Sequence, residues 1–353
     1  MVAFPTCIEE MSLEFLNEHL RSAGAGGTVV GYTTERIGEG VGLLGKLDRI
    51  TLEWDGAGAG APQAVIGKFA TDNEDALAVV STFNFYEKEV NFYNTLADKT
   101  LTRTPEVHVA VHDAETQQFV IVMEDASSGE MGDQVAGATS SQVEATAEEL
   151  VKLHASWWQS PIIAESSFIY DFMHPINYDG IPHALDAYEP ISSKILDLPS
   201  WYDRYRAAVP SALERLAAQP FTLVHGDPRL DNLFFDVGDD PLLVIDWQII
   251  LQAPGVFDIA YFMSQSVPIE TRRDMEADVI TQYHDRLVEL GVTPPSRQEL
   301  WDTYRLACAT CLVYPAVGGG TVDPEDERAV DLVRAMLDRC VTAAEDLDSV
   351  SLL

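Results

Sequence analysis

The sequence predicts an α+β fold with two lobes, a first lobe rich in β-strands and a second lobe that is mainly α-helical. From about residue 28 to 125, short alternating or β-branched runs are separated by glycines. After a polar, glycine-containing stretch that ends near residue 138, apolar residues recur mostly at helical spacing. With 353 residues, the chain is long enough for two cores. We expect a first lobe at residues 1–125, a hinge near 123–128, and a second lobe at 126–353.

The predicted elements of the first lobe follow from the periodicity of its apolar residues. Helical spacing predicts helices at residues 8–23 and 76–98. Alternating runs predict strands at residues 47–54, 64–70, 107–111 and 118–123. The glycines and alanines of residues 55–62 predict a flexible hairpin tip between the first two of these strands. In the second lobe, short apolar runs predict strands at residues 221–224, 232–236 and 241–245.

The charge balance excludes several classes of partner. Lys and Arg number 22 and Asp and Glu number 57, which gives a net charge of −35. Such a field repels nucleic acid and anionic membranes, so we expect neither as a partner. No apolar run reaches the roughly 18 residues of a membrane span. The N-terminus lacks the pattern of a signal peptide, so a cytoplasmic location is expected.

A glycine cluster lies between two predicted strands. Gly40, Gly42 and Gly45 match the pattern G-x-G-x-x-G. In a dinucleotide-binding fold these glycines open a helix, whereas here the strand at 47–54 follows. Glycines between strands favour a flap over nucleotide phosphates, as in kinases. An ordinary glycine-rich hairpin is the alternative, and a nicotinamide-dependent dehydrogenase would rest on this motif alone.

A lysine and a glutamate occupy positions where charge is unexpected. Lys68 lies in the otherwise apolar strand at 64–70. A lysine there can also have no special role, with its aliphatic chain along the sheet and its ammonium group in water. Glu89 shares a helix face with aromatic residues at the flanking helical positions, namely Phe85, Phe92 and Tyr93. A carboxylate on that face needs a cationic partner, and Lys68 is the best candidate. Glu87 could replace Glu89 as this partner, although its neighbours suit a solvent-exposed face.

Three polar residues lie around the short apolar runs at 221–246. Asp227 follows the first run, Asn232 lies five positions later, and Asp246 ends the last run. Phosphoryl transfer requires a group that orients the attacking hydroxyl, ligands for a cation, and positive charge on the phosphates. Asp227 suits the first role and Asn232 and Asp246 suit the second. Lys68 suits the third.

A hairpin would bring the two cation ligands together. If Asp236 opposes Leu242, then Asn232 opposes Asp246, and opposed side chains lie about 5 Å apart. An amide oxygen and a carboxylate at that separation are suitable ligands for Mg²⁺. A register slip of one residue would break the alignment.

The spacing of His225, Asp227 and Asn232 is that of the protein-kinase catalytic loop, H-x-D-x-x-x-x-N, and Asp246 takes the place of the D-F-G aspartate. With these motifs, Lys68 and the glycine cluster, the sequence resembles the aminoglycoside phosphotransferase and choline kinase superfamily, which has a bilobal protein-kinase-like fold. The resemblance covers residues 30–265. Three segments look closest to the ecdysteroid kinase-like branch, namely 38–46, 89–93 and 122–125.

The resemblance implies Mg-ATP bound between the lobes, with the adenine near Met123, Glu124 and Asp125. It implies transfer of the γ-phosphate to a hydroxyl of a small molecule resembling an aminoglycoside, an amino alcohol, a sugar or a sterol. Gln248 departs from the acidic residue that many relatives carry after Ile-Asp-Trp. The alternative is an inactive nucleotide-binding pseudokinase, but such proteins usually lose one of the key groups and none is lost here.

Four further residues lie near these motifs in the sequence or share their lobe. We expect His225 to hydrogen-bond within its loop and Asp258 to cap a helix or brace the loop. His154 lies on an amphipathic helix and is expected to be packed. The acidity of the chain favours an amine-bearing acceptor, and Asp231 is a candidate ligand for the amine.

Overall fold

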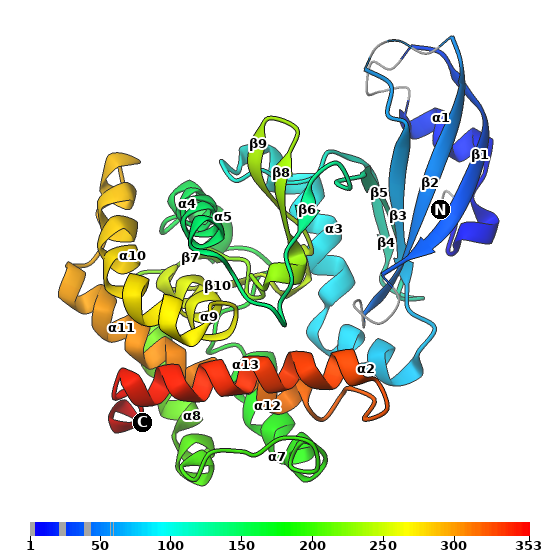
Figure 1. Ribbon diagram of the computed structural model, residues 1–353. Helices are drawn as coiled ribbons and strands as arrows, with labels where there is room; N and C mark the ends of the chain where they lie inside the picture. Colours follow the sequence, from blue (N-terminus) through cyan, green and yellow to red (C-terminus); the bar gives the residue numbers. More distant parts are fainter. Residues whose placement is uncertain (1–3, 21–25, 39–43, 57, 59) are drawn as a thin grey trace. The chain divides into compact units, whose positions relative to one another are not determined.

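The computed structural model describes residues 4–20, 26–38, 44–56, 58 and 60–353. The chain forms two compact units. The first unit comprises residues 1–98 and 104–128, and the second comprises residues 99–103 and 129–353. The first contains a five-stranded sheet and the second is mainly helical, so the predicted α+β fold is confirmed (Figure 1).

The first unit is built around an antiparallel sheet with strand order β1-β2-β3-β5-β4. Its strands are β1 Thr28–Ile37, β2 Gly45–Asp55, β3 Ala64–Ala70, β4 Val107–Asp113 and β5 Gln118–Glu124. Its helical elements are η1 Ile8–Glu10, α1 Leu13–Leu20, α2 Glu74–Phe83, α3 Phe85–Thr95 and, at the boundary with the second unit, η3 Ala97–Lys99.

The alternation of side chains along β3 assigns its residues to two faces of the sheet. Val65 and Phe69 join a core cluster with Leu16 and Leu20 of α1. Lys68 therefore lies on the opposite face. Tyr86 of α3 packs on the same face as Lys68, where its ring stacks on that of Phe119 with 4.0 Å between the ring centroids.

The predicted helix at residues 76–98 is two helices. Asn84 has φ 56° and ψ 40° and ends α2 in the left-handed conformation, from which α3 begins. Asparagine tolerates this conformation better than most residues do, which periodicity alone does not reveal. The helix predicted at 8–23 is η1 followed by α1, and residues 21–23 lie outside the described part of the chain.

The second unit is mainly helical and contains two small sheets, β10-β7 and β6-β8-β9. Its strands are β6 Glu130–Met131, β7 Thr222–Val224, β8 Leu233–Val237, β9 Asp240–Val244 and β10 Leu251–Ala253. Its helices up to the catalytic region are α4 Ser140–Ser156, α5 Pro161–Ala164, α6 Pro175–Tyr178, α7 Gly180–Ser192, α8 Tyr202–Ala217, η4 Leu230–Asn232 and η5 Trp247–Ile249. The later helices are α9 Val256–Gln265, α10 Ile269–Glu289, α11 Arg297–Thr310, α12 Val313–Gly318, α13 Glu327–Asp346 and η6 Ser349–Leu352.

Helix α9 is the centre of the second unit. All of its residues are buried, and α4, α10, α11 and α13 pack against it. Cys308, Cys311 and Cys340 are buried around it as thiols. Over the described residues, no helix combines the length and apolar character that crossing a membrane requires.

Candidate active site

The predicted ion pair of the first unit is present. Lys68 Nζ lies 2.8 Å from Glu89 Oε1, and the Glu89 side chain is fully buried. Lys68 occupies the middle of β3, opposite Leu47 and Ile121. A carboxylate buried in this way depends on its cationic partner, because its desolvation would otherwise favour the protonated form.

The other predicted nucleotide-binding residues of this unit divide into two groups. Gly40 and Gly42 lie outside the described residues. Met123 and Glu124 are the last two residues of β5, and Asp125 follows the strand. The Glu124 N–H donates to Glu106 O at 2.8 Å, and the Asp125 carboxylate accepts from Arg49 Nε at 2.9 Å. These contacts fix the end of β5 against its neighbours.

In the second unit, Gly226 determines the shape of the loop at residues 225–232, which is the catalytic loop of the sequence prediction and is called so below. Its φ is +83°, and a Cβ atom there would lie 2.3 Å from Ile249 O. Only glycine fits both constraints, which explains the His-Gly-Asp order. The buried His225 then spans the loop, with Nε2 2.9 Å from Ile245 O and with Nδ1 accepting the Asp227 N–H at 3.3 Å. The expectation of loop hydrogen bonding for His225 is confirmed.

Asp258 at the start of α9 braces this loop from the core. Its fully buried carboxylate accepts the N–H groups of His225 at 2.7 Å and Gly226 at 2.9 Å. His154 Nε2 lies 3.2 Å from the same carboxylate, and its Nδ1 lies 2.9 Å from the Tyr283 hydroxyl. Asp258 is thus a brace, and His154 is a packed histidine, as the sequence predicted.

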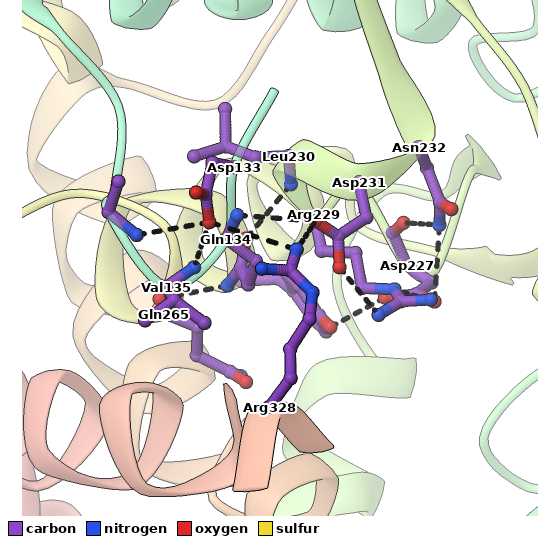
Figure 2. A network of polar contacts seen from close by, with 12 residues as sticks. Asp133, Gln134, Val135, Asp227, Arg229, Leu230, Asp231, Asn232, Gln265 and Arg328 are labelled. Atoms are coloured by element: carbon purple, nitrogen blue, oxygen red, sulfur yellow. Dashed lines mark hydrogen bonds and ion pairs between the residues drawn. The ribbon is translucent and has the colours of Figure 1, made fainter. Parts of the chain in front are cut away.

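Three residues hold the Asp227 carboxylate, two by hydrogen bonds and Arg229 by an ion pair. Figure 2 shows Asn232 and Arg229 beside it. Tyr261 on α9 donates its hydroxyl to Oδ1 at 2.5 Å. Asn232 Nδ2 lies 3.3 Å from Oδ2 and also donates to the Asp227 backbone carbonyl, and Arg229 Nε lies 3.4 Å from Oδ2. Burial is the main cause that raises the pKa of Tyr261 well above its usual range, and the Asp227 carboxylate is the next. Tyr261 is therefore protonated and acts as the hydrogen-bond donor.

The hairpin register differs by one residue from the prediction. Phe235, not Asp236, opposes Leu242, and Val237 opposes Asp240 across a two-residue turn in which Gly238 has φ +61°. This turn sets the register, which places Ile245 opposite Asn232 through an Ile245 N–H bond to Asn232 O of 3.0 Å. The predicted cross-strand pairing of Asn232 with Asp246 is therefore wrong.

Asp246 is still close to Asn232 in the chain path, because it directly follows Ile245, which is hydrogen-bonded to Asn232. It is half-buried, and its φ of 67° and ψ of 68° place it in the left-handed region. The Asn232 amide donates through Nδ2 to Asp227, which leaves its Oδ1 without a hydrogen-bond donor among the described residues. An amide oxygen oriented in this way and a neighbouring carboxylate are hard oxygen donors, so the chemistry of the pair fits Mg²⁺.

Three residues that contact the catalytic loop were not predicted. Tyr261 lies on α9, Arg229 lies within the loop, and Gln134 lies in the segment after β6. Tyr261 follows Asp258 by three positions, which puts both residues on one face of the helix. This spacing could have indicated that Tyr261 also faces the loop. Gln134 carried no sequence signal, because its contacts span about 100 positions.

Asp231 does not present a carboxylate for an amine. Its side chain is fully buried, and Oδ2 lies 3.1 Å from Arg229 Nη1. Its Oδ1 accepts the Gln134 N–H at 3.2 Å. Burial alone would lower the pKa of Arg229, but the Asp227 and Asp231 carboxylates outweigh it and raise that pKa.

The fold and these motifs define a kinase-like class of phosphotransferase. A residue pair of the Lys68–Glu89 type lies in a β-rich unit, and an HGD loop lies in a helical one. The comparison with protein families agrees: residues 77–300 match the Phosphotransferase enzyme family, and the chain belongs to this family.

Solved structures share the fold at low sequence identity. A proposed aminoglycoside phosphotransferase from Ralstonia eutropha JMP134 is 14% identical, with a TM-score of 0.60 over 96% of this chain and 98% of that chain. Choline kinase LicA from Streptococcus pneumoniae is 15% identical, with a TM-score of 0.52 over 94% and 98%. A GDP complex of an aminoglycoside 2′-phosphotransferase is 12% identical, with a TM-score of 0.53 over 92% and 93%. No curated protein sequence matches this chain significantly.

Proposed function

We propose that this protein transfers the γ-phosphate of ATP to a hydroxyl group of a small molecule. The observation that carries the proposal is the arrangement of the HGD loop, in which Asn232 contacts Asp227 directly and Asp246 follows the strand residue bonded to Asn232. This arrangement would supply an orienting carboxylate and hard cation ligands, which are groups that phosphoryl transfer requires.

Asp227 is the catalytic residue of this proposal. Its carboxylate would accept a hydrogen bond from the acceptor hydroxyl. It would take the proton as the new P–O bond forms and the bond between the γ-phosphorus and its bridging oxygen breaks, which releases ADP. Because Tyr261 and Asn232 donate hydrogen bonds to it and Arg229 forms an ion pair with it, its orientation is restricted. Such a group suits a loose phosphoryl-transfer transition state, which depends more on positioning than on a strong base.

We propose roles in nucleotide binding for residues of each unit, taken separately. Asn232 and Asp246 would hold Mg²⁺, which when bound neutralises charge on the phosphates. Lys68, kept charged by Glu89, would contact the α- and β-phosphates. Gly40 and Gly42 would cover the phosphates, and the adenine would lie near Met123, Glu124 and Asp125. The GDP bound to a protein of the same fold supports the use of a nucleotide.

The acceptor is proposed to resemble an aminoglycoside, an amino alcohol, a sugar or a sterol. The similar structures include a choline kinase and an aminoglycoside phosphotransferase, which supports a small hydroxyl-bearing molecule. Within the family we place the chain nearest the ecdysteroid kinase-like branch, on the strength of residues 38–46, 89–93 and 122–125. We propose that it acts in the cytoplasm, where ATP is available.

A screen of ATP consumption against these four acceptor classes tests the proposal. Asp227→Asn keeps the shape of the side chain and removes its charge, so turnover with any acceptor found should fall by about 10²–10⁴-fold while ATP affinity changes little. Unchanged turnover in this variant would refute the assignment of Asp227. ATP binding by calorimetry without transfer to any acceptor would instead favour a nucleotide-binding protein without catalysis.

A further inference from the structure

The catalytic loop rests on a second polar cluster that touches neither phosphate nor acceptor in the proposed function. We define the clamp as Gln134, Arg229 and Asp231 (Figure 2). Arg229 bridges two carboxylates, with Nε 3.4 Å from Asp227 Oδ2 and Nη1 3.1 Å from Asp231 Oδ2. Asp231 thereby fixes the guanidinium that fixes the catalytic carboxylate.

Gln134 secures the other side of the clamp. It is fully buried, and its backbone N–H donates to Asp231 Oδ1 at 3.2 Å, while its side-chain Oε1 accepts the Leu230 N–H at 2.9 Å. Its own position is set by Arg339 of α13, which donates to its carbonyl at 2.7 Å, and by the Gln265 carbonyl, which accepts its Nε2–H at 3.0 Å. One residue therefore joins the catalytic loop to α9 and α13.

The backbone before Gln134 packs directly on the loop and on strand β8, which follows the loop. A Cβ atom at Gly132 would lie 2.7 Å from Leu230 O, and one at Gly129 would lie 2.5 Å from Phe235 O. This approach excludes larger residues at both positions. The loop that carries Asp227 thus has a rigid support on the side of the clamp.

Stability alone does not account for a fully buried carboxylate at this place. A buried ion pair gains little over apolar residues of the same volume, because desolvation offsets the attraction of the charges. Orientation is a different matter, because a misplacement of about 1 Å at a reacting group can cost about 10²-fold in rate. The clamp offers such orientation, since Arg229 has a planar fork that can hold two carboxylates at once.

We propose that Asp231 and Arg229 are positioning residues for Asp227, so that phosphoryl transfer depends on a buried carboxylate remote from both substrates. The inference rests on the proposed function. Asp231→Asn is the sharpest test, because its amide oxygen can still accept the Gln134 N–H while its NH₂ group faces the Arg229 donor. Arg229 then loses its anchor without a change in side-chain volume.

The expected result is a fall in kcat of about 10²-fold with little change in the KM for ATP. Arg229→Met should cause a similar loss, because it leaves no guanidinium to bridge both carboxylates. The double variant Arg229→Met with Asp231→Asn should lose no more than the worse single variant, because the two residues act as one unit. Arg328→Met should have little effect, since Arg328 lies 3.8 Å from Asp231 and is 45% exposed.

The matched control is Glu276→Gln, which makes the same charge-to-amide change at a carboxylate paired with Arg272 at 2.7 Å, away from the catalytic loop. It should unfold at lower denaturant concentration but keep wild-type kcat. Wild-type kcat in Asp231→Asn, or single-variant losses that multiply in the double variant, would overturn the proposal.

The failures of the two proposals are distinguishable by assaying Asp227→Asn alongside, with ATP and each acceptor of the screen and with water as acceptor. If Asp227→Asn is inactive and Asp231→Asn is fully active, only the clamp is wrong. If Asp227→Asn is as active as wild type, or no acceptor is phosphorylated, the proposed function is wrong. A crystal structure of Asp231→Asn needs no acceptor: Arg229 should leave Asp227 Oδ2, and an unmoved Arg229 would contradict the clamp.

Discussion

Each of the two units buries a carboxylate completely beside a cationic side chain, but the two sites are built in different ways. Glu89 and Lys68 come from one helix and one strand, 21 positions apart in the sequence. Asp231 is held by its near neighbour Arg229 and by Gln134, which lies 97 positions away. The first site is a product of regular elements, whereas the second is a product of irregular backbone.

This difference separates two ways of preparing charge for catalysis. The Lys68–Glu89 pair holds a cation whose position follows from the pleat of β3 and the pitch of α3. The clamp holds an anion, Asp227, through an intermediate residue and several backbone groups. We therefore expect the first site to tolerate changes in its surroundings and the second to transmit them to the catalytic group.

Breaking the Lys68–Glu89 pair is expected to have the largest effect on stability. Glu89→Met leaves the Lys68 ammonium buried without its carboxylate, which should cost about 3–5 kcal/mol in the free energy of unfolding. The double variant Lys68→Met with Glu89→Met should recover most of this loss, because two apolar side chains replace two buried charges. Urea denaturation of the wild type and the two variants measures both values.

Activity should not follow stability in this series. Phosphoryl transfer should remain low in the double variant, because the lysine proposed to contact the α- and β-phosphates is gone. Recovery of both stability and turnover would mean that the pair serves the fold alone. Lys46→Met is the control, since Lys46 forms an exposed ion pair with Asp72 and should change neither quantity much.

The same contrast explains how far the sequence could predict the site. The Lys68–Glu89 pair could be predicted because both residues lie in elements with a fixed period. The fold class followed from the same periodicities. The hairpin register was wrong by one residue because the two-residue turn at Gly238 and Asp239 decides it, and several turns fit that composition.

The clamp and the Tyr261 contact had no comparable signal. Arg229 and Asp231 lie in a loop where no period assigns side chains to a face. Gln134 meets them only because two close glycine contacts and Arg339 of α13 bring that segment onto the loop. Asn84 shows the same limit in the first unit, since one left-handed residue divides a continuous helical pattern.

Lys88 provides a second test of buried charge in the first unit, because it is buried and is next to Glu89 in the sequence. Burial lowers its pKa from 10.5 to about 8. Below pH 8, Lys88 is charged in both states, and its burial destabilises the folded state. Between pH 8 and 10.5 the folded state releases the proton while the unfolded chain keeps it, so stability rises with pH by up to about 3 kcal/mol.

Lys88→Met should therefore be more stable than wild type at pH 7, and the difference should shrink towards pH 10.5. Denaturation midpoints at four or five pH values measure this change, with Lys46→Met again as the control. A difference that stays constant over this range would show that Lys88 does not titrate as its burial predicts.

The smallest expected effect is that of the Tyr261 hydroxyl on Asp227. Tyr261→Phe removes a 2.5 Å hydrogen bond to Oδ1 and leaves the ring packed against Tyr314, at 4.5 Å between centroids. Two consequences oppose each other: the freed carboxylate becomes a stronger base, and it loses one of its two hydrogen-bond donors. Because a loose transition state depends little on the base, we expect orientation to dominate and kcat to fall about tenfold.

Tyr314→Phe is the matched control, because it removes the hydroxyl from the neighbouring, half-buried ring and should leave kcat unchanged. A rise in kcat in Tyr261→Phe would mean that basicity limits turnover, and Asp227 would then act chiefly as a proton acceptor. A fall would place Tyr261 with the clamp, as a donor that holds the second oxygen of the same carboxylate. The direction of the change in kcat therefore decides whether the contacts of Asp227 matter mainly for its orientation or mainly for its affinity for a proton.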